Sequence, residues 1–282
     1  MTTSHLPQIK LGLALLFALA AHSATGQGQQ SINLISSADG KTIAANLFKP
    51  DGPGPFPAMV IMHDCSGLGP RASGAPGRWA KLLQEDYVVI LPDSFRSRGI
   101  DNGVCMIYDS AIHRSVNGAV RAADAYAALA ALRELPYVDA RAIGIMGGSH
   151  GGWATLATIV APGERRDPLA EAKRQGFAAA IALYPSCQVQ YGDWTPKRAN
   201  GNSGPMISHS GFYRTLAPTL ILTGEKDDWT PAQPCQTMVE ASRAQGQSID
   251  IKVYAGAHHA FDNDAPVRFI ASRNNSNSPT GR

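Results

Sequence analysis

The sequence that decides the fold is IGIMGGSHGG, at residues 143–152. An apolar run ends there in the pattern G-x-S-x-G, with Ser149 as its central residue, and a helical pattern follows at once. We therefore expect a strand, a sharp turn and a helix in succession, with the serine hydroxyl exposed at the corner. Glycines on both sides of the serine lack the Cβ atoms that would collide in so tight a turn. This context makes Ser149 a candidate nucleophile, although the pattern alone is a weak signal.

Apolar runs on both sides of this turn alternate with helical patterns. Strands are expected at residues 58–62, 87–91, 142–146, 177–183, 219–222 and 249–253, and helices near residues 78–85, 111–135 and 234–245. Residues 32–47 alternate around Asp39-Gly40, which predicts a hairpin. Strands that alternate with helices indicate a mostly parallel sheet covered on both faces. The expected fold class is α/β, in one domain of residues 27–264.

The two ends of the chain differ from this central part. Lys10 precedes an apolar run at residues 11–21, and small residues follow, which is typical of a secretory signal peptide. We assign residues 1–26 to this signal. The apolar run is short for a membrane span, so we expect export to the periplasm or the medium and no membrane span afterwards. An uncleaved anchor is the alternative. Residues 265–282 form a polar tail that cannot bury enough apolar surface to order itself alone.

The composition narrows the possible functions. The 282 residues are 44% hydrophobic and 17% charged, with a formal net charge of +3 and no run of Lys and Arg, so nucleic-acid binding is not expected. No CxxC pair is present, which gives a zinc site no support. The four cysteines are Cys65, Cys105, Cys187 and Cys235. In an oxidising compartment this number suggests two disulfides in one of three connectivities, with free thiols as the alternative.

The residues after two later strands complete a catalytic pattern. A serine hydroxyl needs a histidine to accept its proton, and the histidine needs a carboxylate to orient it. In an α/β sheet these groups follow the carboxyl ends of strands, in the order Ser, Asp or Glu, His. One strand leads to Asp227 and Asp228, and the last leads to His258 and His259. The types, order and positions indicate a Ser-Asp-His triad.

Six motifs connect the chain with a known family. They are His63-Asp64-Cys65-Ser66-Gly67, Pro92-Asp93-Ser94-Phe95, Gly147-Gly148-Ser149-His150-Gly151-Gly152, Gly224-Glu225-Lys226-Asp227, Thr230-Pro231 and His259-Ala260-Phe261. With these motifs the chain, from about residue 32 to residue 261, resembles the dienelactone hydrolase family of the α/β-hydrolase fold. The founding enzymes of that family use a cysteine nucleophile, and Ser149 in its place points to ordinary ester hydrolysis. The family pattern also favours Asp227 over Asp228 and His259 over His258.

The resemblance implies further roles near the nucleophile. The backbone N–H groups of Cys65 and His150 would bind the oxyanion, which leaves packing as the role of the His150 imidazole. Asp64 aligns with an acidic residue that contacts the nucleophile in the cysteine enzymes, and a loop-ordering role is an equal alternative here. Arg96 and Arg98 lie in the loop whose arginines hold a substrate carboxylate in the family. Neither falls on the family position, so this specificity is not carried over.

The implied fold also selects a disulfide pairing. Neighbouring strands precede Cys65 and Cys105, and neighbouring strands precede Cys187 and Cys235. We therefore expect the pairs Cys65–Cys105 and Cys187–Cys235, each closing a loop at the catalytic edge. The fold usually ends in an amphipathic helix, for which only residues 265–272 are available. We expect a truncated chain or a missing helix, and an exposed apolar sheet face.

The leading interpretation is an exported serine hydrolase that cleaves a small-molecule carboxylic ester through an acyl-enzyme, without a metal or organic cofactor. A peptidase with the same triad is the second interpretation. A non-catalytic binding protein with a relic triad is the third. The aromatic residues that could line a substrate pocket are Phe95, Tyr108, Trp194 and Trp229.

Overall fold

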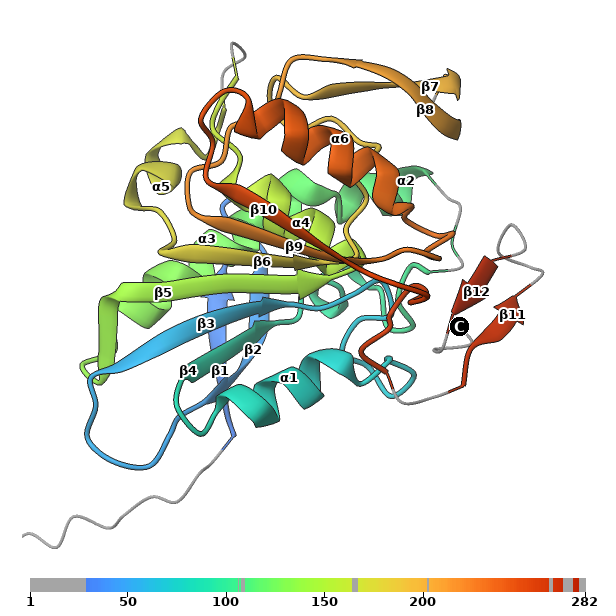
Figure 1. The fold of residues 1–282 in the computed structure, drawn as a ribbon. Helices are drawn as coiled ribbons and strands as arrows, with labels where there is room; N and C mark the ends of the chain where they lie inside the picture. Colours follow the sequence, from blue (N-terminus) through green and yellow to red (C-terminus); the bar gives the residue numbers. More distant parts are fainter. Residues whose placement is uncertain are drawn as a thin grey trace, which may run out of the picture.

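An eight-stranded sheet with helices on both faces forms the centre of the structure (Figure 1). The structure is a computed structural model that describes residues 29–105, 107, 110–163, 167–201, 203–263, 266–270 and 276–278. The segment assigned to a signal peptide lies outside these residues. The strands of the sheet are β1 (Gln30–Ile35), β2 (Thr42–Phe48), β3 (Phe56–Met62), β4 (Val88–Pro92), β5 (Val138–Gly148), β6 (Ala179–Leu183), β9 (Thr219–Gly224) and β10 (Ile249–Tyr254).

The strand order confirms the expected α/β class. The strands lie in the order β1, β2, β4, β3, β5, β6, β9 and β10. All neighbouring pairs from β4 to β10 are parallel, whereas β2 pairs antiparallel with both β1 and β4. β1 and β2 are the hairpin expected around Asp39-Gly40. The parallel order brings the carboxyl ends of β3, β5, β6, β9 and β10 to one edge of the sheet.

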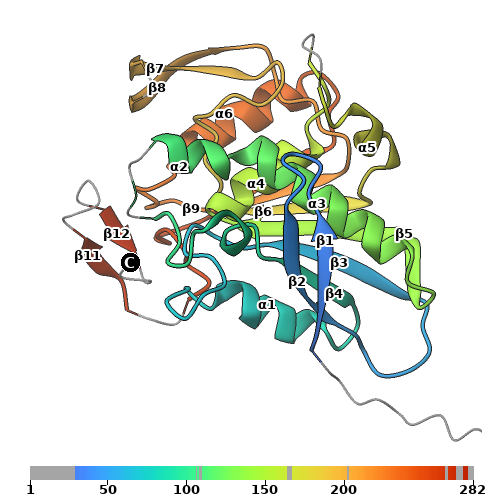
Figure 2. The ribbon, with the colours of Figure 1, turned by 180° about the vertical axis from the view of Figure 1, so that it is seen from behind.

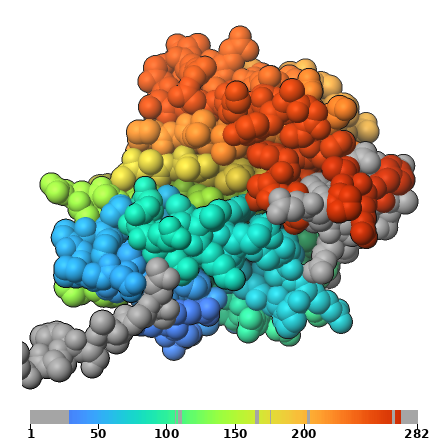
Figure 3. Space-filling view, turned by 60° about the horizontal axis from the view of Figure 1, so that its bottom comes forward, coloured from blue at the N-terminus to red at the C-terminus, as the bar shows by residue number. Residues whose placement is uncertain are grey.

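Helices cover the two faces of the sheet unequally. The helices are α1 (Ala75–Leu83), α2 (Ser110–Ser115), α3 (Gly118–Arg133), α4 (His150–Ile159), α5 (Ala170–Gln175) and α6 (Ala232–Arg243), with a 3₁₀ turn η1 (Arg96–Arg98). α3, α4 and α6 pack on one face (Figure 2), and α1 packs on the other, where its residues form the teal surface of Figure 3. Within the described part of the chain, no helix has the length and apolarity that crossing a bilayer requires.

The central strands are apolar along their whole length because both of their faces are covered. All five residues of β4 are buried. Val88 and Ile90 pack into the core under α3, while Val89 and Leu91 pack on the opposite face with Trp79 of α1. Burial of each such aliphatic side chain contributes about 1.5–3 kcal/mol to stability. This double-sided core fixes the strand ends that carry the candidate catalytic residues.

The prediction of one helix at residues 111–135 is wrong. The structure has α2 and α3 in its place, with residues 116–117 between them. Asn117 has extended backbone angles (φ −67°, ψ 174°), and its side-chain oxygen accepts the N–H of Val120 at 3.0 Å. Asparagine at an N-cap is more favourable than asparagine inside a helix, since its side chain replaces a missing backbone acceptor. The alanine-rich pattern concealed this boundary.

An additional hairpin lies apart from the central sheet, between β6 and β9 in the sequence (Figure 1). It consists of β7 (Thr195–Asn200) and β8 (Ser203–Ser210), which pair antiparallel. The sequence analysis did not predict it, because residues 195–210 are rich in polar residues, Gly and Pro and lack an alternating apolar pattern. At its base the rings of Trp194 and His209 lie 4.6 Å apart.

The described residues after β10 contain no helix. Two three-residue strands, β11 (Arg268–Ile270) and β12 (Ser276–Ser278), form an antiparallel pair within the tail, which was expected to be without structure of its own. On the face of β9 and β10 opposite α6, Leu220 is 36% exposed and Tyr254 is 38% exposed. Apolar residues of the sheet are therefore partly exposed on this face.

Candidate active site

Ser149 lies on the sharp turn between β5 and α4. Its backbone has φ 55° and ψ −117°, a conformation that costs a non-glycine residue on the order of 1–3 kcal/mol. A Cβ at Gly151 would collide with the carbonyl oxygen of Met62 at the end of β3. The glycine is therefore required for the turn to approach the neighbouring strand. The Ser149 N–H donates to the carbonyl oxygen of Leu183 at 3.0 Å, which anchors the turn to β6.

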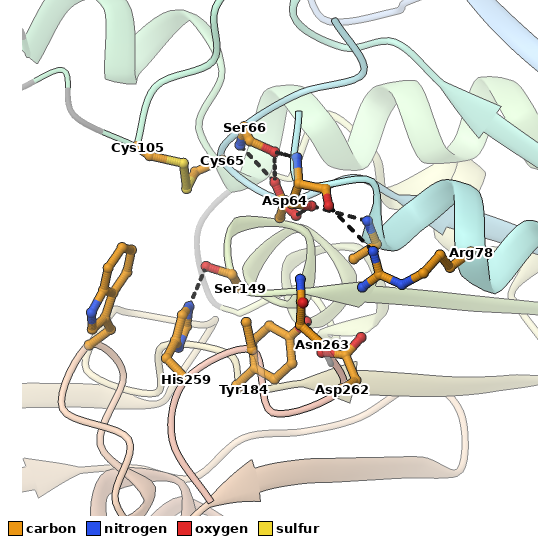
Figure 4. A pocket seen from close by; sticks show the side chains of 14 residues that line it. Asp64, Cys65, Ser66, Arg78, Cys105, Ser149, Tyr184, His259, Asp262 and Asn263 are labelled. Carbon is orange, nitrogen blue, oxygen red and sulfur yellow. Dashed lines mark hydrogen bonds between the residues drawn. A yellow bond between two sulfur atoms is a disulfide. The ribbon is translucent and has the colours of Figure 1, made fainter. Parts of the chain in front are cut away.

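The structure brings Ser149, His259 and Asp227 together from three strand ends, and Figure 4 shows the hydrogen bond between Ser149 and His259. The distance from Ser149 Oγ to His259 Nε2 is 3.0 Å, and His259 Nδ1 lies 2.9 Å from Asp227 Oδ2. Both His259 and Asp227 are buried. Because a carboxylate only accepts, the tautomer that fits these contacts has its proton on Nδ1, which leaves Nε2 free to accept from the serine hydroxyl. The two hydrogen bonds use Asp227 and His259, the residues that the family pattern favours over their neighbours Asp228 and His258.

The carboxylate of Asp227 is held by its own loop. Asp227 Oδ1 accepts the backbone N–H groups of Trp229 at 3.0 Å and of Thr230 at 2.8 Å. The Thr230 hydroxyl lies 2.9 Å from both Asp227 Oδ2 and the carbonyl oxygen of Tyr184. These donors fix the plane of the carboxylate toward His259. The sequence analysis used Thr230 only as part of a motif and assigned it no role.

Aromatic side chains enclose the ring of His259. Trp229 stacks on it with ring centroids 5.0 Å apart and an interplanar angle of 14°, and Tyr184 contacts it edge-on at 4.9 Å. The Tyr184 hydroxyl and the Trp79 Nε1–H each donate to Asp262 at 2.8 Å. Burial and the charge of Asp262 raise the pKa of Tyr184 well above its usual value, so the phenol remains a donor. No sequence motif had indicated this support of the histidine loop.

The two backbone N–H groups expected to bind an oxyanion lie at the start of α4 and in the loop after β3. Neither the N–H of His150 nor that of Cys65 donates to another group in the described residues. Cys65 lines the same pocket as Ser149 and His259. Its carbonyl oxygen accepts the N–H of Val104 at 2.6 Å.

Both disulfides have the pairing expected from the fold. Cys65 is bonded to Cys105 across 40 residues, and Cys187 is bonded to Cys235 across 48 residues. The first disulfide lines the pocket beside Ser149 (Figure 4), whereas the second lies in the core between β6 and α6. The two crosslinks therefore hold different parts of the catalytic edge.

Asp64 orders the loop that carries Cys65. Its carboxylate accepts the backbone N–H of Ser66 at 2.7 Å and the hydroxyl groups of Ser66 and Ser73. These contacts support the loop-ordering alternative. Among the described residues, no hydrogen bond connects Asp64 with Ser149.

The two candidate arginines do not line the pocket. The side chain of Arg98 is 2% exposed and forms ion pairs with Asp124 at 2.8 Å and with Asp39 at 2.9 Å. Arg96 is largely exposed and pairs with Asp93 at 3.0 Å. Neither arginine is positioned to hold a carboxylate in the pocket that contains Ser149.

The pocket around the triad mixes apolar and charged side chains. Its lining residues are Asp64, Cys65, Ser66, Ser73, Ala75, Arg78, Cys105, Ser149, Tyr184, Trp229, His259, Ala260, Asp262 and Asn263. Of the aromatic candidates, Trp229 lines the pocket, Phe95 and Trp194 are buried in the core, and Tyr108 lies outside the described residues. The described residues contain no group of three or more His, Cys, Asp or Glu side chains placed to hold a metal ion.

Sequence comparison identifies a family and a curated relative. The sequence model described as "Dienelactone hydrolase family" matches residues 43–278. A provisionally named carboxymethylenebutenolidase from Methylorubrum extorquens is 26% identical to this chain over 274 residues. The match covers 93% of this chain and 86% of that protein.

Solved structures share the fold. Esterase 2 of Thermogutta terrifontis, phosphonylated by cyclosarin, has a TM-score of 0.56 and 18% identity, over 86% of this chain and 87% of that one. A puromycin-hydrolyzing peptidase of Mycobacterium tuberculosis has a TM-score of 0.58 and 20% identity, over 86% of this chain and 38% of that one. At these identities the likeness shows a common fold and does not choose between ester and peptide substrates.

Proposed function

This chain belongs to the dienelactone hydrolase family, and from that premise we propose that it is a serine hydrolase that cleaves carboxylic esters through an acyl-enzyme. The observation that carries the proposal is the continuous chain of hydrogen bonds from Ser149 through His259 to Asp227. A serine nucleophile with an imidazole at 3.0 Å and an oriented carboxylate behind it is suited to acyl transfer.

In the first half of the proposed reaction, Ser149 Oγ attacks the ester carbonyl while His259 Nε2 accepts the hydroxyl proton. Asp227 keeps the proton on Nδ1 and stabilises the imidazolium that forms. The negative oxygen of the tetrahedral intermediate accepts hydrogen bonds from the N–H groups of Cys65 and His150. His259 then returns its proton to the alkoxide as the C–O bond breaks, so an alcohol leaves and the acyl group stays on Ser149.

In the second half, water attacks the acyl-enzyme, and His259 accepts one of its protons. Collapse of the second tetrahedral intermediate breaks the bond to Ser149 Oγ, which regains the proton from His259. The carboxylic acid leaves, and the overall reaction consumes one ester and one water. Every proton transfer in this sequence uses Nε2 of His259, which is free to accept when Nδ1 donates to Asp227.

Paired variants at neighbouring positions test these roles. Asp227→Asn and His259→Gln are compared with Asp228→Asn and His258→Gln, and Ser149→Ala serves as the nucleophile variant. We expect hydrolysis of p-nitrophenyl acetate to fall about 10⁴-fold or more in Ser149→Ala and His259→Gln, because the triad acts as a unit. The two neighbour variants should keep activity within about threefold of the wild type.

Covalent labelling separates the alternatives. A fluorophosphonate should label the wild type and not Ser149→Ala, and a wild type without labelling or ester hydrolysis would contradict the proposal. Cleavage of a peptide panel with higher kcat/KM than p-nitrophenyl esters would favour a peptidase. Equal activity in the Asp227 and Asp228 variants would show that the acid is wrongly assigned.

We also propose that the protein is exported to the periplasm or the medium. The two disulfides support this location, since disulfides persist in oxidising compartments. N-terminal sequencing of the protein recovered from the periplasm or medium should give an end after Ala20, Ser23 or Gly26. Recovery only from the reducing cytoplasm, with Met1 intact, would contradict export.

A further inference from the structure

Behind the catalytic pocket, the side chain of Arg121 connects two separate segments of the site. Arg121 lies in α3 and is fully buried. Its Nη2–H donates to the carbonyl oxygen of His63 at 2.6 Å, and its Nη1–H donates to Nδ1 of His150 at 2.7 Å. His63 is two residues before Cys65, and His150 directly follows Ser149. One guanidinium therefore holds both segments that carry the proposed oxyanion donors.

A second hydrogen bond extends this connection to the peptide that contains the Cys65 N–H. His63 Nδ1–H donates to the carbonyl oxygen of Asp64 at 2.9 Å. That carbonyl and the Cys65 N–H belong to the same peptide unit, whose atoms are coplanar. A hydrogen bond to the Asp64 carbonyl oxygen therefore fixes the direction of the Cys65 N–H and makes that N–H a stronger donor. Arg121 is thus connected with the peptide of the Cys65 N–H through a single residue, His63.

Burial and neighbouring charges set the protonation states of Arg121 and of the two histidines that it contacts. Burial, and then the positive charge of Arg121, lower the pKa of His63 and of His150 well below the usual value, so both imidazoles are neutral. Burial lowers the pKa of Arg121 to about 10, which leaves the guanidinium charged at neutral pH. Its cation lies 5.2 Å from the ring centroid of Phe95. Within the described residues, no carboxylate oxygen lies within 4.0 Å of the Arg121 guanidinium.

We propose that Arg121 is a positioning residue for the oxyanion hole, which aligns the N–H groups of Cys65 and His150 and places a buried positive charge behind them. This inference rests on the proposed serine hydrolase activity. The stationary charge favours the negative tetrahedral intermediate over the neutral ester, so its contribution is made in the transition state. The His150 imidazole then has a role as the acceptor that ties α4 to α3.

A purely structural role explains this arrangement poorly. The charges of Asp124, Asp64 and Asp93 act on Arg121, but none of them forms a close ion pair with it, and its Nε–H has no acceptor among the described residues, so its burial is costly. A well-packed apolar side chain would give α3 and α4 more stability than an arginine with one unsatisfied donor. The geometry therefore points to a function for the charge and its two directed donors.

Three variants test the inference. Arg121→Met removes the charge and both donors at similar length, and Arg121→Lys keeps the charge with one donor group. Tyr126→Phe is the matched control, because it removes another buried bond between α3 and α4, from the Tyr126 hydroxyl to the carbonyl oxygen of Thr158 at 2.9 Å. All three are compared with the wild type for kcat and KM on p-nitrophenyl acetate and for inhibition by phenylboronic acid, which forms a tetrahedral anion on Ser149.

In Arg121→Met we expect kcat to fall about 100-fold with KM changed less than about threefold, as on loss of an oxyanion donor. The inhibition constant of phenylboronic acid should rise in Arg121→Met as kcat falls. In Arg121→Lys, kcat should be about tenfold higher than in Arg121→Met. Tyr126→Phe should keep the kcat of the wild type. A folded Arg121→Met protein with unchanged kcat, or an equal loss in Tyr126→Phe, would overturn the inference.

Two further readouts keep the test decisive. If Arg121→Met does not fold, Arg121→Lys alone is decisive, with an expected fall in kcat of about tenfold at unchanged KM. In ¹H–¹⁵N spectra the amide resonances of Cys65 and His150 should both shift in Arg121→Lys and remain in place in Tyr126→Phe, and unshifted resonances contradict the inference without reference to turnover. A wild type that neither hydrolyses esters nor reacts with a fluorophosphonate refutes the proposed function instead.

Discussion

The two disulfides allow a test in which stability and activity change separately. Both crosslinks lie at the catalytic edge of the sheet, but only Cys65–Cys105 lines the pocket that contains Ser149. Cys187–Cys235 lies in the core between β6 and α6. The perturbation is therefore a pair of double variants, one with alanine at both positions of the first disulfide and one with alanine at both positions of the second.

The expected loss of stability is nearly the same for the two variants. The chain-entropy relation gives about 3.9 kcal/mol for the separation of 40 residues and about 4.1 kcal/mol for the separation of 48 residues. For a chain of this size, a loss of about 4 kcal/mol lowers Tm by about 8–16 °C. Because the two values differ by only about 0.2 kcal/mol, each variant is a stability control for the other.

The expected effect on catalysis differs. Removal of Cys65–Cys105 frees the loop that presents the Cys65 N–H, so we expect kcat for p-nitrophenyl acetate to fall about tenfold, a part of the 10²–10³-fold effect of losing an oxyanion donor. Removal of Cys187–Cys235 should leave kcat within about twofold of the wild type. KM should change little in either case.

The assay combines urea denaturation with steady-state kinetics at 15 °C, where both variants retain their fold. Equal losses of kcat in the two variants would refute the reasoning, because a general loss of rigidity would then explain the effect. A first variant with wild-type kcat would refute it equally, since the crosslink would then have no part in placing the donor.

Two other predictions follow from buried groups. His63 and His150 are neutral in the folded protein and titrate near 6.5 when unfolded, so below that pH the unfolded chain binds more protons and stability falls. Between pH 7.5 and 5.5 each histidine should remove about 1.4 kcal/mol from the free energy of unfolding. In urea titrations of His63→Gln, the free energy of unfolding should fall by about 1.4 kcal/mol less over this pH range than in the wild type. The same pH dependence as in the wild type would contradict a neutral, buried His63. Thr230→Val removes the hydroxyl beside Asp227 Oδ2 and should lower kcat about tenfold at unchanged KM, as the loss of a bond to a charged group would. Steady-state kinetics on p-nitrophenyl acetate check this, and an unaltered kcat would mean that the backbone donors alone orient the carboxylate.

Much of the fold could be predicted from the sequence because its central strands are buried on both faces. Such strands appear as continuous apolar runs, and the burial of all five residues of β4 is one example. The hairpin of β7 and β8 could not be predicted in this way. Most of its residues are exposed, and although Met206 packs against the core, no run of buried residues marks the two segments as strands.

The geometry of the candidate triad was also predictable, since Ser149 directly follows β5, and Asp227 and His259 lie in the loops that follow β9 and β10. The supporting residues were not. Asp262 accepts from Trp79, which is 183 residues away in the sequence, and Arg121 reaches His63 across 58 residues. Contacts between such distant side chains depend on how α1 and α3 pack on the sheet. No local pattern of residue types contains that information.

The two proposed oxyanion donors, the N–H groups of His150 and Cys65, differ in how strongly the surrounding backbone fixes their direction. The peptide before the His150 N–H is fixed by α4 itself, because the carbonyl oxygen of Ser149 accepts the N–H of Trp153 at 2.9 Å. The Cys65 N–H lies in an irregular loop, where no repeating hydrogen bonds define its direction. That loop is held by the disulfide to Cys105, by the N–H of Val104, and by the bond from His63 to the adjacent carbonyl. Most of the supporting contacts thus hold the Cys65 N–H, which no regular secondary structure orients. This is expected if the direction of the Cys65 N–H limits the rate.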